Sequence, residues 1–82
     1  MARQPDFNTV DLHGLTSAEA KKKLERELAR APREIKRLIV IHGCNNGTVL
    51  RDMVRSLHHP RILETVPTFS NDGETVIYLK RI

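Results

Sequence analysis

Two histidines, each followed by a glycine, end similar short runs of strand-forming residues, at His13-Gly14 and at His42-Gly43. A histidine side chain transfers protons near neutral pH and can also bind a metal ion. Asp11 precedes His13 by two positions, and alternation along a strand places both side chains on the same side. Asp11, His13 and His42 are therefore predicted to form a catalytic cluster for acid-base cleavage of a phosphodiester. A divalent metal ion stays open as a cofactor, but the single cysteine leaves no zinc-binding set and no residue is predicted as a metal ligand.

The segment after the second histidine has the composition of a phosphate-binding loop. Backbone amides at the start of a helix attract anions, glycines let a phosphate approach the main chain closely, and asparagine side chains add donors. Arg51 and Arg55 share one face of the helix expected after this loop, and guanidinium groups suit phosphate oxygens. The residues predicted to bind a nucleic-acid backbone are Gly14, Gly43, Asn45, Asn46, Gly47, Arg51 and Arg55.

Each of these residues also has a purely structural interpretation. A histidine after a strand often caps a turn, and Asp11 can accept backbone amides that hold the adjacent loop closed. Asparagine and glycine residues in the loop are also ordinary turn formers. The basic ridge of the first expected helix is interpreted as a solvated face with ion pairs, among them Glu19 with Lys23.

The strands and helices that position these residues alternate along the chain. The uninterrupted apolar run at 38–41 predicts a central strand that is buried on both faces. Pro67 demotes the third expected strand to an edge of the sheet, because proline has no amide to donate. Strands are expected at 7–12, 38–41, 62–69 and 75–79, and helices from a capping box at 16–19 to near Pro32, and at 48–58.

The connections between these elements determine how the strands pair. A strand, a helix and a second strand of this length form a right-handed crossover, which makes the first two strands parallel and brings both His-Gly turns to one edge. The turn sequence at 70–73 makes the last two strands antiparallel. The order β-α-β-α-β-β therefore predicts an α+β fold, a two-layer sandwich with a four-stranded mixed sheet and both helices on one face.

Length and composition limit the class of protein. The 82 residues fit one domain, predicted at 7–82 after a flexible leader at 1–6. Fourteen Lys and Arg against ten Asp and Glu give a charge of +4, which suits a nucleic-acid partner, and an aromatic content of 4% favours backbone recognition over base stacking. The sequence has no signal peptide and no long apolar run, so we expect a cytoplasmic monomer with no membrane partner.

Two short motifs resemble those of one known family. Residues 10–14 (Val-Asp-Leu-His-Gly) match its first motif, hydrophobic-Asp-Leu-His-Gly. Residues 41–43 (Ile-His-Gly), with Gly47 and the Leu-Arg pair at 50–51, match its second motif, His-Gly-x-Gly-x-Gly-x-Leu-Arg. On these motifs the chain resembles the Smr (small MutS-related) domain family from about residue 8 to residue 79.

The resemblance implies both a fold and a function. It implies a two-layer sandwich similar to the carboxyl-terminal domain of bacterial translation initiation factor three, with the sheet order 1-2-4-3. It also implies a nicking-type endonuclease that acts on DNA or RNA, with Asp11 and His13 as catalytic residues. The residues that it implies for backbone binding are His42, Gly43, Gly47 and Arg51.

This sequence departs from the family pattern in its second motif, where Asn45 stands in place of the middle glycine. Asparagine reaches the left-handed conformation at a modest energetic cost, whereas glycine does so freely. A non-catalytic nucleic-acid or ribosome-associated binding module is therefore the alternative function. A protein interaction module with purely structural strand-end loops is a third possibility.

Overall fold

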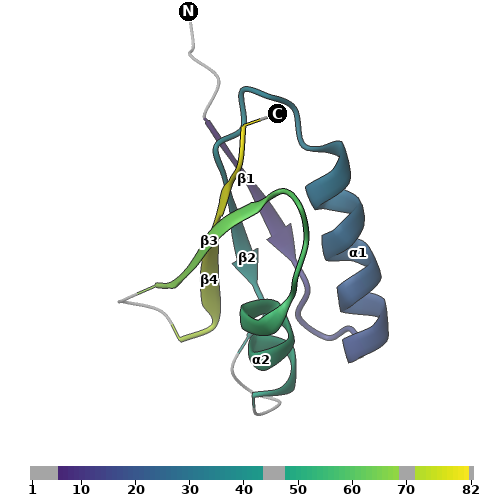
Figure 1. Ribbon diagram of the computed structural model, residues 1–82. Helices are drawn as coiled ribbons and strands as arrows, with labels where there is room; N and C mark the ends of the chain where they lie inside the picture. Colours follow the sequence, from purple (N-terminus) through teal and green to yellow (C-terminus); the bar gives the residue numbers. More distant parts are fainter. Residues whose placement is uncertain (1–5, 44–47, 69–71, 82) are drawn as a thin grey trace, which may run out of the picture.

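The computed structural model describes residues 6–43, 48–68 and 72–81, and these form one sheet with two helices (Figure 1). The elements, in chain order, are β1 (Phe7–Asp11), α1 (Ser17–Arg30), β2 (Arg37–Ile41), α2 (Val49–Ser56), β3 (Ile62–Pro67) and β4 (Glu74–Leu79). The predicted order β-α-β-α-β-β and the α+β class are confirmed. In the part of the chain that the structure describes, no helix has the length and hydropathy needed to cross a membrane.

Helix α1 begins and ends where local chemistry requires. The Thr16 hydroxyl accepts a hydrogen bond from the Glu19 amide at 3.2 Å, and the Glu19 carboxylate accepts one from the Thr16 amide at 3.0 Å. These bonds form the predicted capping box, and the backbone amide of Thr16 is the main cause that lowers the pKa of Glu19. The helix ends at Arg30 because Ala31, which precedes Pro32, is extended with φ −61° and ψ 127°.

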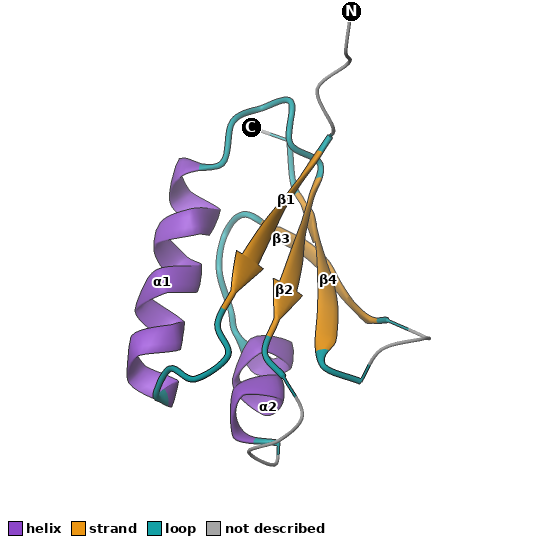
Figure 2. Cartoon of the chain, turned by 180° about the vertical axis from the view of Figure 1, so that it is seen from behind, coloured by secondary structure: helices purple, strands orange, loops and turns teal. Residues whose placement is uncertain are grey.

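The sheet has the order β1-β2-β4-β3, which agrees with the order that the Smr resemblance implied (Figure 2). Strands β1 and β2 are parallel, and β4 is antiparallel to both of its neighbours. As the sequence predicted, β2 is an inner strand and the strand that contains Pro67 is an edge strand. The carboxyl ends of β1 and β2 therefore lie at the same end of the sheet.

One face of the sheet and both helices enclose a single core. The sequence prediction that β2 is buried on both faces is wrong, because Leu38 and Val40 are fully buried whereas Ile39 and Ile41 are only half-buried. Both helices lie on the same face of the sheet, as predicted, and no helix of the described residues covers the opposite face (Figure 2). The core cluster consists of Val10, Leu12, Ala20, Leu24, Leu28, Leu38, Val40, Leu50, Val54, Ile77 and Leu79.

Candidate active site

The two His-Gly turns lie beside each other at the carboxyl ends of β1 and β2. The Leu12 amide donates to the Ile41 carbonyl oxygen at 2.7 Å and so extends the parallel pairing beyond the last residue of β1. The two strands leave the sheet toward the start of α1 and toward α2, at the lower end of the molecule in Figure 1. Ligands of sheets with parallel strands collect at this carboxyl end.

Asp11 and His13 form a hydrogen-bonded pair on the surface at this edge. Asp11 Oδ1 accepts from His13 Nδ1 at 2.8 Å and from the His13 backbone amide at 3.1 Å. Because a carboxylate only accepts, Nδ1 carries the hydrogen, and Nε2 of the neutral ring holds the free lone pair. The His13 side chain is 70% exposed, and no residue of the described ranges forms a hydrogen bond with Nε2. The pair therefore presents an oriented imidazole nitrogen to solvent.

The electrostatics of the pair keep Asp11 ionised. The side-chain hydrogen bond from His13 is the largest cause that lowers the pKa of Asp11, and the backbone hydrogen bond from the same residue is the second. The positive charge of Lys23 contributes in the same direction. An ionised carboxylate at Nδ1 fixes the tautomer and the orientation of the ring, as carboxylates do for catalytic and metal-bound histidines.

Lys23 of α1 belongs to the site, although the sequence analysis did not predict it. Its Nζ donates to the backbone carbonyl oxygen of Asp11 at 2.9 Å, and the expected ion pair with Glu19 is not formed. A signal for this position existed, because Ala20 and Leu24 face the core and Lys23 borders that apolar stripe. A lysine at the margin of the apolar stripe can reach the sheet, whereas a lysine at the centre of the polar face cannot.

His42, in contrast, is buried, with 4% of its surface exposed. Its Nδ1 lies 3.0 Å from the Gly43 carbonyl oxygen, which only accepts, so Nδ1 is the donor. Its Nε2 lies 2.9 Å from Thr75 Oγ1 and in the neutral ring accepts from that hydroxyl, which in turn accepts from Arg55 Nε at 3.4 Å. Both ring nitrogens are occupied, and the imidazole connects β2, β4 and α2.

The register of β1 against β2 explains why the two histidines separate. Asp11 pairs with Ile41, and continuing this register by two residues sets His13 beside Gly43. The contact geometry agrees, because a Cβ built on Gly43 would lie 3.5 Å from His13 Cβ. His13 and His42 are thus one residue out of step, and side chains alternate between faces along a strand. Asp11 and His13 lie together as predicted, whereas His42 is directed to the helix-covered face and away from them.

The two turn glycines differ in what their amides can bind. Gly14 and Gly43 have φ values of 83° and 75°, in the left-handed region that glycine adopts without strain. The Gly43 amide donates to the Gly73 carbonyl oxygen at 3.0 Å and is therefore occupied. The Gly14 amide, next to His13, has no hydrogen bond within 6–43, 48–68 and 72–81 and can donate to an anion. The predicted loop residues Asn45, Asn46 and Gly47 lie outside the described residues.

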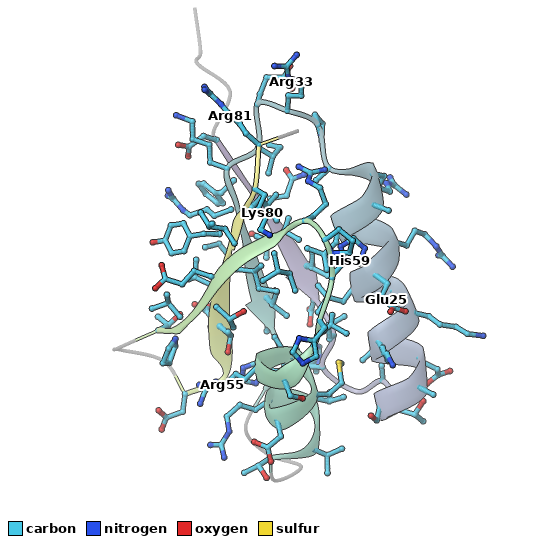
Figure 3. The ribbon with its side chains drawn as sticks, viewed as in Figure 1. Glu25, Arg33, Arg55, His59, Lys80 and Arg81 are labelled. Atoms are coloured by element: carbon cyan, nitrogen blue, oxygen red, sulfur yellow. The ribbon has the colours of Figure 1, made fainter. Side chains whose placement is uncertain are left out.

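The two predicted arginines of α2 have partners of their own. Arg51 Nε lies 3.5 Å from Asp52 Oδ1, and the side chain is half-buried. Arg55 is exposed at the foot of β4 beside α2, where Figure 3 labels it, and its Nε is the group that contacts Thr75. Arg55 thus connects the buried histidine to the surface, and both arginines add positive charge to this end of the sheet.

The donor set at this edge is small for a resident zinc ion. Asp11 and His13 supply one carboxylate and one imidazole, and no group of three or more candidate ligands occurs in the described part of the chain. Resident catalytic zinc sites use three protein ligands. The residues present do not match such a site, so the chemistry below is derived from the groups of the chain itself.

Comparison with known proteins decides the family. The family model described as Smr domain matches residues 10–80, which is most of the chain. The chain belongs to the Smr domain family. No curated protein and no solved structure matches it significantly. The Smr resemblance is thereby confirmed, and the family comprises nucleic-acid-binding and nicking-type nuclease domains.

Proposed function

We propose that this Smr domain is a nucleic-acid endonuclease in which the Asp11–His13 pair activates the nucleophile that cleaves a phosphodiester. The observation that carries the proposal is the bond of 2.8 Å between His13 Nδ1 and Asp11 Oδ1, which leaves Nε2 oriented toward solvent. General acid-base catalysis requires a base of this kind within hydrogen-bond reach of the proton that it removes.

In the proposed reaction His13 Nε2 accepts a proton from a water molecule as the water oxygen attacks phosphorus. The bond between phosphorus and the leaving oxygen breaks, and that oxygen takes a proton from solvent. Asp11 stabilises the imidazolium that forms and keeps the ring in place. The electron pair of the broken bond stays on the departing oxygen. The imidazolium of His13 then returns its proton to solvent, so the sum of the steps is hydrolysis.

Two groups beside the pair suit the negative charge that grows on the phosphate oxygens. Lys23 holds its ammonium group at the Asp11 carbonyl oxygen, and the Gly14 amide has no hydrogen bond among the residues that the structure describes. Fixed donors directed at developing charge are commonly the largest contribution to catalysis. We assign His42 a positioning role, because both of its ring nitrogens are bonded within the protein, to the Gly43 carbonyl oxygen and to the Thr75 hydroxyl.

The test compares cleavage by wild type, His13→Ala and Asp11→Asn on labelled single-stranded RNA, duplex DNA and branched DNA. We expect His13→Ala to lower the cleavage rate by about 10²- to 10⁴-fold, with little change in binding. His58→Ala is the matched control, because His58 is also an exposed histidine and lies beyond the end of α2. Circular dichroism verifies that each variant folds.

Cleavage by His13→Ala at the wild-type rate would contradict the proposal. Each substrate is assayed once with magnesium and once with EDTA. This pair of conditions separates cleavage by protein groups alone from cleavage that also uses an ion bound with the substrate.

A second candidate function is a binding module that does not cleave. The observation that favours it is the burial of His42, because the described residues then offer one exposed histidine at this edge instead of two. For this function, binding weakens steeply as salt rises, and Arg51→Ala weakens binding to all sequences alike. Wild-type protein that binds every substrate and cuts none would favour this candidate over the nuclease.

A further inference from the structure

A basic groove of about 410 Å³ lies at the end of the sheet opposite the Asp11–His13 pair. Because β4 runs antiparallel to β2, its carboxyl end lies beside the start of β2, where Tyr78 pairs with Arg37. The loop between α1 and β2, the start of β3 and the residues after β4 complete the walls. The groove is therefore assembled from three segments that are distant in the sequence.

The groove is lined by positive charge without a carboxylate. Five of the 14 lysines and arginines of the chain line the groove, and no Asp or Glu is among the lining residues. Glu64 pairs with Tyr78, and Asp6 lies 3.6 Å from the Arg37 guanidinium, but neither carboxylate lines the groove. Figure 3 shows Arg33 and Arg81 at the upper end of the molecule, Lys80 below them, and Arg55 at the lower end. The basic lining residues are Arg33, Lys36, Arg61, Lys80 and Arg81.

Arg61 provides a buried cation beneath the groove. It is 7% exposed, and its Nη1 donates to the carbonyl oxygens of Leu28 at 3.3 Å and Ala31 at 2.9 Å. These carbonyls end α1, and the negative end of the helix dipole favours a cation there. No carboxylate pairs with Arg61 in the described residues, and its Nε is buried without a partner. A buried charge without a counter-charge favours an anion nearby.

Main-chain hydrogen bonds hold the basic residues of the groove in place. The Lys80 amide donates to the Arg61 carbonyl oxygen at 2.7 Å, and the Leu79 amide donates to the Lys36 carbonyl oxygen at 2.9 Å. The three segments are thus fixed to each other independently of the side chains that reach solvent. A site whose scaffold is already ordered loses less conformational entropy when it binds a ligand.

The groove also has an aromatic wall. Tyr78 of the inner strand β4 is 39% exposed, and the exposed Leu63, at an irregularity of β3, lines the groove with it. An aromatic ring next to cations is the combination that binds single strands, with phosphates on the cations and a base on the ring. One ring serves one base, which is consistent with the low aromatic content of the chain.

We propose that this groove binds a single strand of nucleic acid, with its phosphates on Lys36, Lys80 and Arg81 and one base against Tyr78. The proposal rests on the nucleic-acid partner of the proposed function, but not on cleavage. Four residue steps of β2 separate the groove from the Asp11–His13 edge, which is about 13 Å at the rise of a strand. A nucleic-acid strand longer than this distance can contact both ends of the sheet at once.

The test measures binding in the His13→Ala background, so that the probe stays intact. The probes are a fluorescein-labelled oligouridylate of about 12 nucleotides and a DNA duplex of the same length. The groove variant is Lys36→Gln, Lys80→Gln, Arg81→Gln. A control with the same change of charge is Lys21→Gln, Lys22→Gln, Arg26→Gln on the exposed face of α1.

We expect the groove variant to bind oligouridylate at least about tenfold more weakly, and the slope of log affinity against log salt to fall by about 2, since each lost phosphate contact removes about 0.7. The control should lose less than about threefold. We expect Tyr78→Leu to lose about fivefold and Tyr78→Phe to retain affinity, because the phenylalanine ring still stacks on a base.

Equal losses for the groove variant and the control would overturn the proposal. So would tighter binding of the duplex than of oligouridylate. These results are independent of the nuclease proposal, because a wild-type chain that binds oligouridylate through the groove and cleaves nothing would contradict only the latter.

Discussion

The two His-Gly turns of this protein share a sequence pattern and differ in almost every physical property. His13 is exposed, and its Nδ1 is bonded to a carboxylate. No described residue forms a hydrogen bond with its Nε2. His42 is buried, with Nδ1 on a carbonyl oxygen and Nε2 on a hydroxyl. The same residue pair thus gives an oriented, exposed imidazole in one turn and a structural connection in the other.

Two features of the sheet produce this difference. The first is register, because His13 lies opposite Gly43 instead of opposite the other histidine, and a shift of one residue changes the face. The second is the position of each strand in the sheet. Strand β1 is an edge strand, whereas β2 pairs with β4, which supplies Thr75. Similar motifs on neighbouring strands therefore do not imply a shared site.

Replacement of the two histidines should separate their roles most strongly. We expect His42→Ala to lower the free energy of unfolding by about 2–4 kcal/mol, because it creates a cavity and leaves buried polar groups unpaired. We expect His13→Ala to change it by less than about 0.5 kcal/mol, as is usual for an exposed side chain. Urea denaturation followed by circular dichroism measures both values, and similar losses in the two variants would contradict the comparison.

Replacement of the partner of His42 should have a smaller effect in the same direction. Thr75→Val keeps the shape of a fully buried side chain and removes the hydroxyl that bonds His42 Nε2 and Arg55 Nε. We expect a loss of about 1–2 kcal/mol in the free energy of unfolding. Thr75→Ser retains the hydroxyl and is the control for the polar contact. If the valine variant is as stable as wild type, the bond to His42 does not stabilise the fold.

The smallest expected effect is the titration of Asp11. Its pKa lies below the ordinary value of 3.8 chiefly because His13 donates to it. The bond therefore contributes to stability above the pKa of the unfolded chain, and this contribution disappears as pH falls through the lower folded value. Carbon-13 NMR of the carboxyl group should show a midpoint below 3.8 in wild type and a higher midpoint in His13→Ala, which loses the side-chain bond but keeps the bond from the backbone amide. Equal midpoints would show that the pair does not form in solution.

The sequence predicted the elements well because their signals are local. The capping box at Thr16 and Glu19 is formed, and Pro67 lies in an edge strand as its missing amide requires. The apolar run of β2 correctly predicted an inner strand. It did not predict that one face of β2 is only half-buried, since a run of four apolar residues does not show how many layers cover the sheet. The order of the strands came from the family resemblance and not from the hydrophobic pattern.

The sequence predicted the pairing of Asp11 with His13, because both belong to one strand and alternation places them together. It did not predict the position of His42, since no pattern within a strand contains the register between two strands. The charge pattern of the helix predicts an ion pair of Lys23 with Glu19, because it contains no information on the neighbouring sheet, where Lys23 bonds the Asp11 carbonyl oxygen. Contacts between elements distant in the chain are the part that required the structure.

The place of β4 in the sheet has a consequence for synthesis of the chain. β4 is the last of these strands to leave the ribosome, yet it lies between β2 and β3. Until it emerges, β2 and β3 have no partner on these sides, and Thr75 cannot reach His42. Unpaired strand edges attract other chains and promote aggregation. We therefore expect a chain that stops before Glu74 to be prone to aggregation.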